Sequence, residues 1–412
     1  MRIRYGYYMK TLLIISAGIE SIGGIELAKS MGLHVVVSDM NPDAPGFAIA
    51  DDQLLASTYD VEATVAAARA YYEDVRPLDG VMCIASDVPL TVASVAAALG
   101  LPGIPVESAR LATDKLAMKK RFAADGVPIP WFSPVSSAEQ LHELVATQGL
   151  PLVIKPVDSR GSRGVLRLTP GVDLDWAYEI ARGHSPTRRV MLERFLPGPQ
   201  VSTESLIIEG QAYTPGFSDR NYEYLERYAP HIIENGGQLP SHLDGATQQA
   251  VRDLVQQAAA SMGIRNGVVK GDIVVTNGQP HVIELAVRLS GGYFCTHEIP
   301  LNTGVDLVGA AIRQALGERV DPKELIPKWN RPVAQRYLFP SPGMVRAVEE
   351  ADRFADHPDV AYLEIRAKPG DRIGPVDSHP ARAGVVITTG ETVESAVSMA
   401  KTVVDRIQVL VE

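Results

Sequence analysis

The sequence predicts an α/β protein in which a parallel sheet is followed by two regions of α+β structure. Three observations support this prediction. Apolar strands alternate with helical segments over residues 11–100, pairs of strands joined by glycine-containing turns follow, and residues 331–412 combine strands with one long helix. The chain has 412 residues, which is long enough for two or three domains.

The first part of the chain alternates buried strands with helices. Strands are predicted over 11–16, 34–39 and 80–86, and helices over 22–31, 61–75 and 92–100. Continuous apolar strands between helices indicate a parallel sheet that is covered on both faces. Asp114 is typical of a helix start, and Gly126 with Pro128 would end that helix, so we place a domain boundary near residue 113.

The composition is that of an ordinary soluble enzyme. Hydrophobic residues make up 46% and charged residues 21% of the chain, and the net charge is −10 without a run of like charges. This balance argues against nucleic acid as a main partner. Cys83 and Cys295 are the two cysteines, which excludes a disulfide framework and a cysteine-based zinc site.

The N-terminus resembles a secretory signal only superficially. Basic residues precede the apolar run 11–16, but an amphipathic helix pattern follows it in place of a small-residue cleavage site. We interpret 11–16 as the first strand, residues 1–8 as an extension and Met9 as an alternative start. No apolar stretch approaches the roughly 20 residues of a membrane span. We therefore expect a soluble, cytoplasmic protein with no membrane partner.

Residues 150–168 predict two strands joined by a polar loop that contains glycine. The first strand ends in Lys155-Pro156, and the loop reads DSRGSRG. Backbone N–H groups of such a loop can surround an anion, and Lys155 would add a positive charge for a phosphate. The alternative is a flexible hairpin tip with a solvated lysine.

A second pair of strands is predicted around Asn277-Gly278, which is a strong β-hairpin signal. Asp272 lies on the first of these strands and Glu284 near the end of the second, at about the same level. Mg²⁺ prefers carboxylate oxygens, so this pair could hold one or two Mg²⁺ ions. The alternative is a pair of solvated residues on a sheet edge.

The order of the motifs resembles that of the ATP-grasp superfamily over nearly the whole chain. The motifs are TDKLAMKK with Lys115, VIKP with Lys155, the loop SRGSRGV, the hinge LERFLPG and the run IELAVRLSGG with Arg288. The resemblance implies a Rossmann-like pre-ATP-grasp domain over 1–113, a two-lobed ATP-grasp domain over 114–330 and a small C-terminal α+β domain over 331–412. The nucleotide-binding lobe would cover about 114–190 and the catalytic lobe about 191–330.

The resemblance also implies which residues contact ATP. Lys115 and Lys155 would bind its phosphates. A loop would close over the phosphates with Ser159, Gly161, Ser162 and Gly164. A hinge would receive adenine with Glu193, Phe195 and Leu196. Many family members have Glu after the hinge glycine where this chain has Gln200, so ribose would be bound by Glu204 in its place or by Gln200 itself.

The remaining assignments concern metal and catalysis. Asp272 and Glu284 match the Mg²⁺ ligands, for which Mn²⁺ could substitute, and Arg288 matches the catalytic arginine that faces the transferred phosphate. Ala286 replaces an Asn that many members use, which puts a second metal ion in doubt. The substrate pocket would include Ser290, Gly291 and Gly292, and we also assign to it His297, Glu298 and the loop around Ser86-Asp87.

The implied activity is that of an ATP-dependent carboxylate–amine ligase. Such enzymes phosphorylate a carboxylate, and an amine attacks the acyl phosphate. The run IELAVRLSGG and the C-terminal region look most like those of L-amino acid (dipeptide) ligases, so we expect amino acids or other small carboxylates and amines as substrates. We interpret residues 331–412 as a structural cap, and we expect a homodimer by default.

Three other functions remain as alternatives. A bicarbonate-activating carboxylase of the purine-pathway or biotin-carboxylase type would share the motifs. An NAD-dependent oxidoreductase would use Gly18, Gly23 and Gly24 with Asp39, but Glu20 stands where a glycine should approach the pyrophosphate. An inactive nucleotide-binding subunit would be expected to have lost at least one of the charged motif residues.

Overall fold

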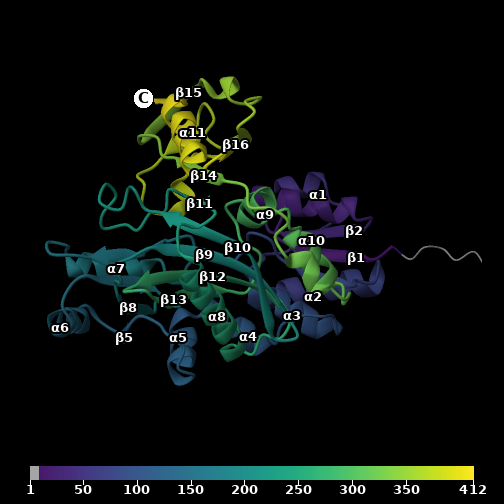
Figure 1. Cartoon of the computed structure of the whole chain (residues 1–412). Coiled ribbons are helices and arrows are strands. Elements are labelled where there is room, and N and C mark those ends of the chain that lie inside the picture. Colours follow the sequence, from purple (N-terminus) through teal and green to yellow (C-terminus); the bar gives the residue numbers. More distant parts are fainter. Residues whose placement is uncertain (1–8) are drawn as a thin grey trace, which may run out of the picture.

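The N-terminal part of the chain forms the parallel sheet that the sequence predicts. The structure is a computed structural model that describes residues 9–412, so the extension 1–8 lies outside the described residues. The strands are β1 (Thr11–Ile15), β2 (His34–Asp39), β3 (Asp52–Leu55) and β4 (Gly80–Met82). They pair in parallel in the order β3-β2-β1-β4. The helices of this part are α1 (Ile22–Ser30), α2 (Val61–Asp74) and α3 (Pro89–Leu99) (Figure 1).

Strand β3 is an element that the sequence analysis did not predict. It has four residues, begins with Asp52 and Gln53, and forms one edge of the sheet. Short edge strands with polar residues are common because they discourage pairing with other chains. They therefore lack the continuous apolar pattern by which β1, β2 and β4 are recognised.

A smaller lobe follows two linking helices. The helices are α4 (Val106–Thr113) and α5 (Lys115–Ala124), and the Asp114 side chain caps α5 by accepting from Ala117 N at 2.9 Å, as predicted. The lobe contains β5 (Phe132–Val135), α6 (Ala138–Gln148), β6 (Leu152–Pro156), β7 (Leu166–Leu168), α7 (Leu174–Gly183) and β8 (Val190–Arg194). Its antiparallel sheet has the order β5-β8-β6-β7. The sheet therefore extends to Arg194, a few residues beyond the lobe boundary near 190.

A large antiparallel sheet forms the rest of the grasp region. Its first strands are β9 (Gln200–Ile208), β10 (Gln211–Asn221), β11 (Gly236–Leu239), β12 (Gly267–Thr276) and β13 (Gln279–Ala286). Helix α8 (Gly245–Ser261) packs against it, and Val251 and Val255 share a fully buried cluster with Val269 and Val282. Asn277 and Gly278 both have positive φ, at 51° and 74°, as the predicted two-residue hairpin requires.

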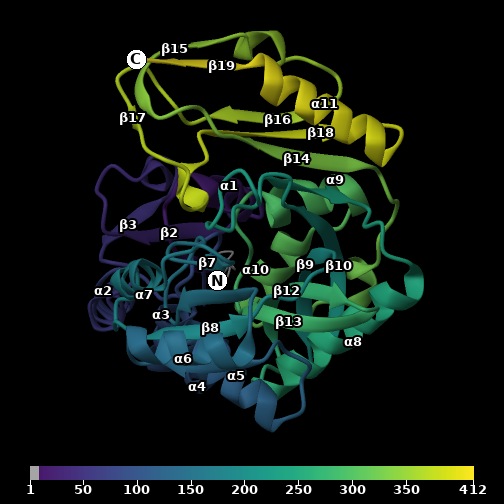
Figure 2. The same ribbon diagram turned by 90° about the vertical axis from the view of Figure 1, so that its left-hand side faces the viewer.

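The C-terminal region continues the large sheet. Its elements are β14 (Val333–Leu338), β15 (Gly343–Glu349), β16 (Val360–Ile365), β17 (Arg372–Ile373), β18 (Gly384–Thr389), α11 (Val393–Arg406) and β19 (Gln408–Val411). The large sheet has the order β13-β12-β9-β10-β11-β14-β18-β16, so it crosses from the grasp region into residues 331–412. Strands β17, β15 and β19 form a separate small sheet. Helix α11 packs on β14 and β18 of the large sheet, where Ala396 and Ala400 share a buried cluster with Ala334 and Val386 (Figure 2).

The N-terminal sheet and the large sheet share one hydrophobic core. Two short helices, α9 (Ile299–Thr303) and α10 (Leu307–Ala315), lie between them. Ile14 of β1, Ile312 of α10 and Val333 of β14 belong to the same fully buried cluster. The described residues include no helix that is both long enough and apolar enough to cross a membrane.

The hinge between β8 and β9 depends on Gly198. Its φ is +132°, and a Cβ built on it would lie 2.0 Å from the carbonyl oxygen of Val275. We expect Gly198→Ala to lower the free energy of unfolding by roughly 2–4 kcal/mol, because strain and a backbone clash combine. The measurement is urea unfolding of the variant beside the unaltered protein.

Gly245→Ala is the matched control, because Gly245 opens α8 and a Cβ there would meet nothing within 4 Å. It should change the free energy of unfolding by less than about 1 kcal/mol. Equal unfolding midpoints for the two variants would contradict the close approach at the hinge.

Candidate active site

A cavity of about 630 Å³ lies where the N-terminal sheet, the smaller lobe, the large sheet and the C-terminal region meet. Every residue that the sequence analysis assigned to ATP, metal, catalysis or the substrate pocket lines it, except Gly164, Glu204 and His297. Residues that are far apart in the chain are therefore brought to one place. The cavity is lined by basic and acidic side chains in similar numbers, and most of them pair with one another.

Two lysines and one glutamate form a buried ionic group in the smaller lobe. Glu193 on β8 is 3% exposed and pairs with Lys155 on β6 and with Lys119 on α5, whose Nζ lies 2.8 Å from Glu193 Oε1. Burial alone would raise the pKa of Glu193, but the two lysines outweigh it and hold this pKa below its usual range. The carboxylate thus holds Lys155 in place at the cavity wall.

Lys119 is a residue that the sequence analysis missed. It is fully buried and also donates to the carbonyl oxygen of Val282 at 2.9 Å, so it ties α5 to β13. A buried lysine needs a charged partner. The only local signal was its place four residues after Lys115, on the same side of the helix.

The loop 159–164 lies over the cavity and touches three other parts of the molecule. Ser162 Oγ donates to the carbonyl oxygen of Ile232 at 2.9 Å. The carbonyl oxygen of Gly161 accepts from His379 N at 3.0 Å. Arg160 stacks on the Tyr59 ring, 3.9 Å from its centre, and donates to the carbonyl oxygen of Asp87 at 3.2 Å. These contacts hold the predicted phosphate loop in place at the cavity wall.

Gly164 lies at the base of this loop, outside the cavity wall. Its φ is +69°, and a Cβ built on it would lie 2.9 Å from His184 Cβ. Because it has no side chain, Gly164 allows the backbone to pass close to His184 at the end of α7 before β7 begins. Ser159 instead faces the cavity and accepts from Lys115 Nζ at 2.7 Å through its carbonyl oxygen.

The hinge residues Phe195 and Leu196 follow β8 and line the cavity beside Gln200. Glu204 is placed differently, because its side chain is fully buried and accepts from Ser290 N at 2.7 Å and from Ser290 Oγ. Burial raises the pKa of Glu204 to about 7, although these hydrogen bonds oppose the shift. Of the two candidates for ribose binding, Gln200 is the one that lines the cavity.

Asp272 and Glu284 face each other across the β12–β13 hairpin. They are direct partners in the ladder because a β-bulge between Asp272 and Ile273 shifts the register by one residue. Without the bulge, Asp272 would face Ile283 and the two carboxylates would point to opposite sides of the sheet. The bulge is thus the feature that brings the predicted pair of carboxylates together.

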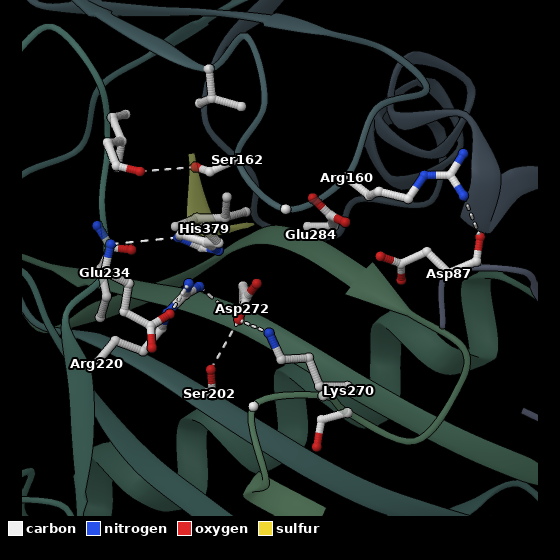
Figure 3. A pocket seen from close by; sticks show the side chains of 18 of the residues that line it. Asp87, Arg160, Ser162, Ser202, Arg220, Glu234, Lys270, Asp272, Glu284 and His379 are labelled. Atoms are coloured by element: carbon white, nitrogen blue, oxygen red, sulfur yellow. Dashed lines mark hydrogen bonds and ion pairs between the residues drawn. The ribbon is translucent and has the colours of Figure 1, made fainter. Parts of the chain in front are cut away.

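Both carboxylates have basic partners. Arg220 Nη1 lies 2.8 Å from Asp272, which also pairs with Lys270 and accepts from Ser202 Oγ at 3.0 Å (Figure 3). Burial alone would raise the pKa of Asp272, but Arg220 and Lys270 hold it well below its usual range. Glu284 Oε2 lies 3.4 Å from Lys115 Nζ.

The two carboxylates fit a divalent cation whose remaining ligands come from elsewhere. They share one wall of the cavity, and oxygen ligands suit Mg²⁺. No group of three or more His, Cys, Asp or Glu side chains within residues 9–412 could hold a metal ion. The protein would therefore supply two carboxylates, and substrate phosphates and water the other ligands.

Arg288 is held by the N-terminal part of the chain. Its Nε and Nη2 both lie 2.6 Å from Asp87 Oδ1. Burial alone would raise the pKa of Asp87, but the Arg288 guanidinium lowers it. The loop around Ser86-Asp87, predicted to reach the pocket, thus fixes the predicted catalytic arginine in one orientation.

The paired glycines after Arg288 make room for a carboxylate from the N-terminal part. Gly292 N donates to Glu20 Oε2 at 2.7 Å, and a Cβ at Gly291 would lie 2.6 Å from the same oxygen. Glu20 also pairs with Arg366 of the C-terminal region at 2.7 Å. Asp39, the predicted ribose acid of the oxidoreductase alternative, instead accepts from Ala17 N at 3.2 Å.

The C-terminal region supplies cavity residues that the interpretation as a structural cap did not include. They are Arg366, His379, Pro380 and Arg382, together with Gln335 and Tyr337 of β14. Arg382 stacks on the Tyr337 ring at 3.7 Å and donates to the carbonyl oxygen of Glu234 at 2.9 Å. No local motif marks these residues, because only the continuation of the large sheet carries them to the cavity.

Comparison with known proteins identifies the same two regions. Residues 112–292 match the model of the ATP-grasp domain, and residues 336–412 match that of L-amino acid ligase C-terminal domain 2. The structure of an L-amino acid ligase from Bacillus licheniformis superposes with a TM-score of 0.83 at 22% identity and covers 99% of this chain and 100% of that one. The ATP-grasp fold predicted from the sequence is therefore confirmed.

Two relatives found by sequence cover different shares of the chain. Protein y4rH of Sinorhizobium fredii is 25% identical over 390 residues, which are 93% of this chain and 79% of that protein. The D-alanine–D-alanine ligase of Gloeobacter violaceus is 30% identical over 200 residues, which are 45% of this chain and 63% of that enzyme. The chain thus spans less than two thirds of that ligase.

The ATP-grasp match includes most of the elements that build the cavity, from Lys115 on α5 to Gly292 after β13. The C-terminal match covers the region that adds Arg366 and Arg382 to the cavity. Residues 112–292 therefore form an ATP-grasp domain, and residues 336–412 form a domain similar to C-terminal domain 2 of L-amino acid ligases.

Proposed function

We propose that this protein joins an amino acid, or another small carboxylate, to an amine through an acyl phosphate. A carboxylate oxygen attacks the γ-phosphorus of ATP, the bond to the bridging oxygen breaks, and ADP leaves with that electron pair. The amine nitrogen then attacks the acyl carbon, and phosphate leaves with the electrons of the carbon–oxygen bond. The products are an amide, ADP and phosphate.

The arrangement around Arg288 is the observation that carries this proposal. The guanidinium lies in the same cavity as Lys115, Lys155, Asp272 and Glu284, and Asp87 holds it in place. A fixed guanidinium can bind a carboxylate and stabilise the negative charge that develops as the phosphoryl group moves. The two lysines would compensate the charge of the ATP phosphates.

A divalent ion on Asp272 and Glu284 would neutralise charge on the transferring phosphoryl group and help to orient it. The loop 159–164 lines the cavity, where its contacts with Ile232, His379 and Asp87 hold it, and it would close over a bound nucleotide. A closed cover would keep water away from an acyl phosphate and so prevent its hydrolysis.

Charged side chains beyond the ATP-binding motifs support an amino-acid substrate. Glu20 and Glu298 line the cavity together with Arg366 and Arg382. Acidic and basic groups side by side suit a zwitterion, whose ammonium and carboxylate groups need opposite partners. The match of residues 336–412 to a domain of L-amino acid ligases points the same way.

The experiment that tests the proposal is ATP turnover with Mg²⁺ against a panel of amino acids, singly and in pairs. We expect ADP and phosphate to form with particular pairs, together with a product whose mass equals that of their condensation. Removing the metal with EDTA should abolish turnover, because the phosphoryl charge would then lack compensation. Phosphate is measured by colorimetry and the product by mass spectrometry.

Turnover that depends on bicarbonate and an amine, without amino-acid condensation, would move the protein to the carboxylating enzymes and overturn the proposal. Binding of ATP without turnover on any member of the panel would do the same. It would favour the inactive subunit considered as an alternative.

Arg288→Lys tests the catalytic assignment. Lysine keeps the positive charge but cannot make the paired contacts with Asp87, so we expect kcat to fall by about 100-fold or more. The KM for ATP should change by less than about threefold, because Arg288 stabilises the reacting groups and not the bound nucleotide. Steady-state kinetics on the best amino-acid pair provide the measurement.

Arg346→Lys is the control, since the Arg346 side chain on β15 is 68% exposed and does not line the cavity. Its kinetics should equal those of the unaltered protein. Unchanged kcat in Arg288→Lys, or a loss that appears only in the KM for ATP, would contradict the assignment.

A further inference from the structure

Glu298 differs from every other acidic side chain of the cavity. It is 3% exposed, and its Oε2 is fully buried without a hydrogen-bond partner in the described part of the chain. Within residues 9–412, the other cavity acids all have partners: Glu20, Asp87, Glu193, Asp219, Glu234, Asp272 and Glu284. A buried carboxyl oxygen without a hydrogen-bond partner is costly, which marks Glu298 as a candidate to bind a polar group of the substrate.

The backbone that presents Glu298 is unusual in two ways. Tyr293 has a φ of +65°, which is rare for a bulky residue, and a π-helical turn follows from Phe294 to Glu298. The carbonyl oxygen of Tyr293 accepts from His297 N at 2.9 Å and from Glu298 N at 3.1 Å. Strained residues and π turns are both found frequently at functional sites.

The same turn is anchored to the segment that follows Arg288. Ser290 Oγ accepts from Cys295 N at 3.2 Å, and Ser290 itself is held by Glu204. Glu298 therefore has a fixed position relative to the arginine side of the cavity. His297, the other residue of this turn assigned to the pocket, packs instead against the rings of Tyr293 and Tyr362.

The surroundings of Glu298 favour its uncharged form. Burial raises the pKa of Glu298 to about 8, Glu234 and Glu204 add to the shift, and Arg336 opposes it. Arg336 on β14 donates instead to the carbonyl oxygens of Gly237 and Gln335. A carboxyl group with a pKa near 8 can both release and accept a proton around neutral pH. An amine substrate is protonated in the same pH range, and its nitrogen must lose a proton before it can attack.

We propose that Glu298 binds the amino group of the amine substrate and takes up the proton that this group must lose. The inference rests on the proposed ligase function and adds a residue for its second step. A proton passes from the ammonium nitrogen to a Glu298 carboxylate oxygen. The freed lone pair of the nitrogen attacks the acyl carbon, and phosphate leaves with the electrons of the carbon–oxygen bond.

Hydroxylamine can replace the amine substrate and so distinguishes formation of the acyl phosphate from the proton transfer that we assign to Glu298. It is largely unprotonated at neutral pH and traps acyl phosphates as hydroxamates without help from a base. With Glu298→Gln we expect amide formation with the amino-acid nucleophile to fall by about 100-fold or more. Hydroxamate formation from the carboxylate substrate and ATP should stay within about threefold of the unaltered protein.

Two further variants sharpen the result. Glu298→Asp keeps a carboxylate and should retain more amide formation than Glu298→Gln. It also serves if Glu298→Gln does not fold, because amide formation should again fall more than hydroxamate formation. Glu391→Gln, at an exposed position in the C-terminal region, is the matched control and should leave both reactions unchanged.

A pH profile gives an independent readout. In the unaltered protein, the kcat/KM for the amine substrate should rise with pH through an apparent pKa near 8, because Glu298 can accept a proton only when it is ionised. The profile of Glu298→Gln should lack this rise. Equal losses of amide and hydroxamate, or undiminished amide formation, would overturn the role of Glu298. Absence of hydroxamate with the unaltered protein would instead overturn the proposed acyl phosphate, and with it this inference.

Discussion

The arrangement of the candidate active site depends on one short junction between the N-terminal sheet and the segment after β13. Ile84 and Leu289 form a parallel bridge, and Ala85 N donates to the carbonyl oxygen of Leu289 at 3.2 Å. Both residues are buried in the core that the two sheets share. The junction places Asp87 against Arg288, so the N-terminal part supports the side chain that we propose to be catalytic.

Compensation of charge is the second constraint on this site. Many charged side chains surround a cavity of about 630 Å³, and nearly every acid faces a lysine or an arginine. Removing a charge from water is expensive unless an opposite charge and hydrogen bonds replace the solvent. The pairs therefore keep Lys155 and Arg288 in defined positions before substrates arrive. Glu298 stands outside this pattern, which is why it carries the inference about the amine.

The sequence predicted those features that local patterns encode. Asp114 caps α5, Asn277 and Gly278 form the hairpin turn, and most of the predicted site residues line one cavity because their order follows the fold. Long-range pairing explains what was missed. The role of Lys119 becomes visible only when Glu193 is seen to pair with it. Glu204 binds Ser290 and therefore does not line the cavity. Arg366 reaches the cavity because the large sheet continues into the C-terminal region. A hydrophobic pattern does not reveal which strands continue a sheet.

The acyl phosphate is the central claim, and the path of oxygen tests it most directly. The carboxylate substrate is labelled with ¹⁸O at both oxygens, and the phosphate released during amide formation is analysed by mass spectrometry. Attack of the carboxylate on ATP predicts one labelled oxygen in each phosphate formed, because the carbon–oxygen bond breaks in the second step. Phosphate without label, formed together with the amide, would contradict the account.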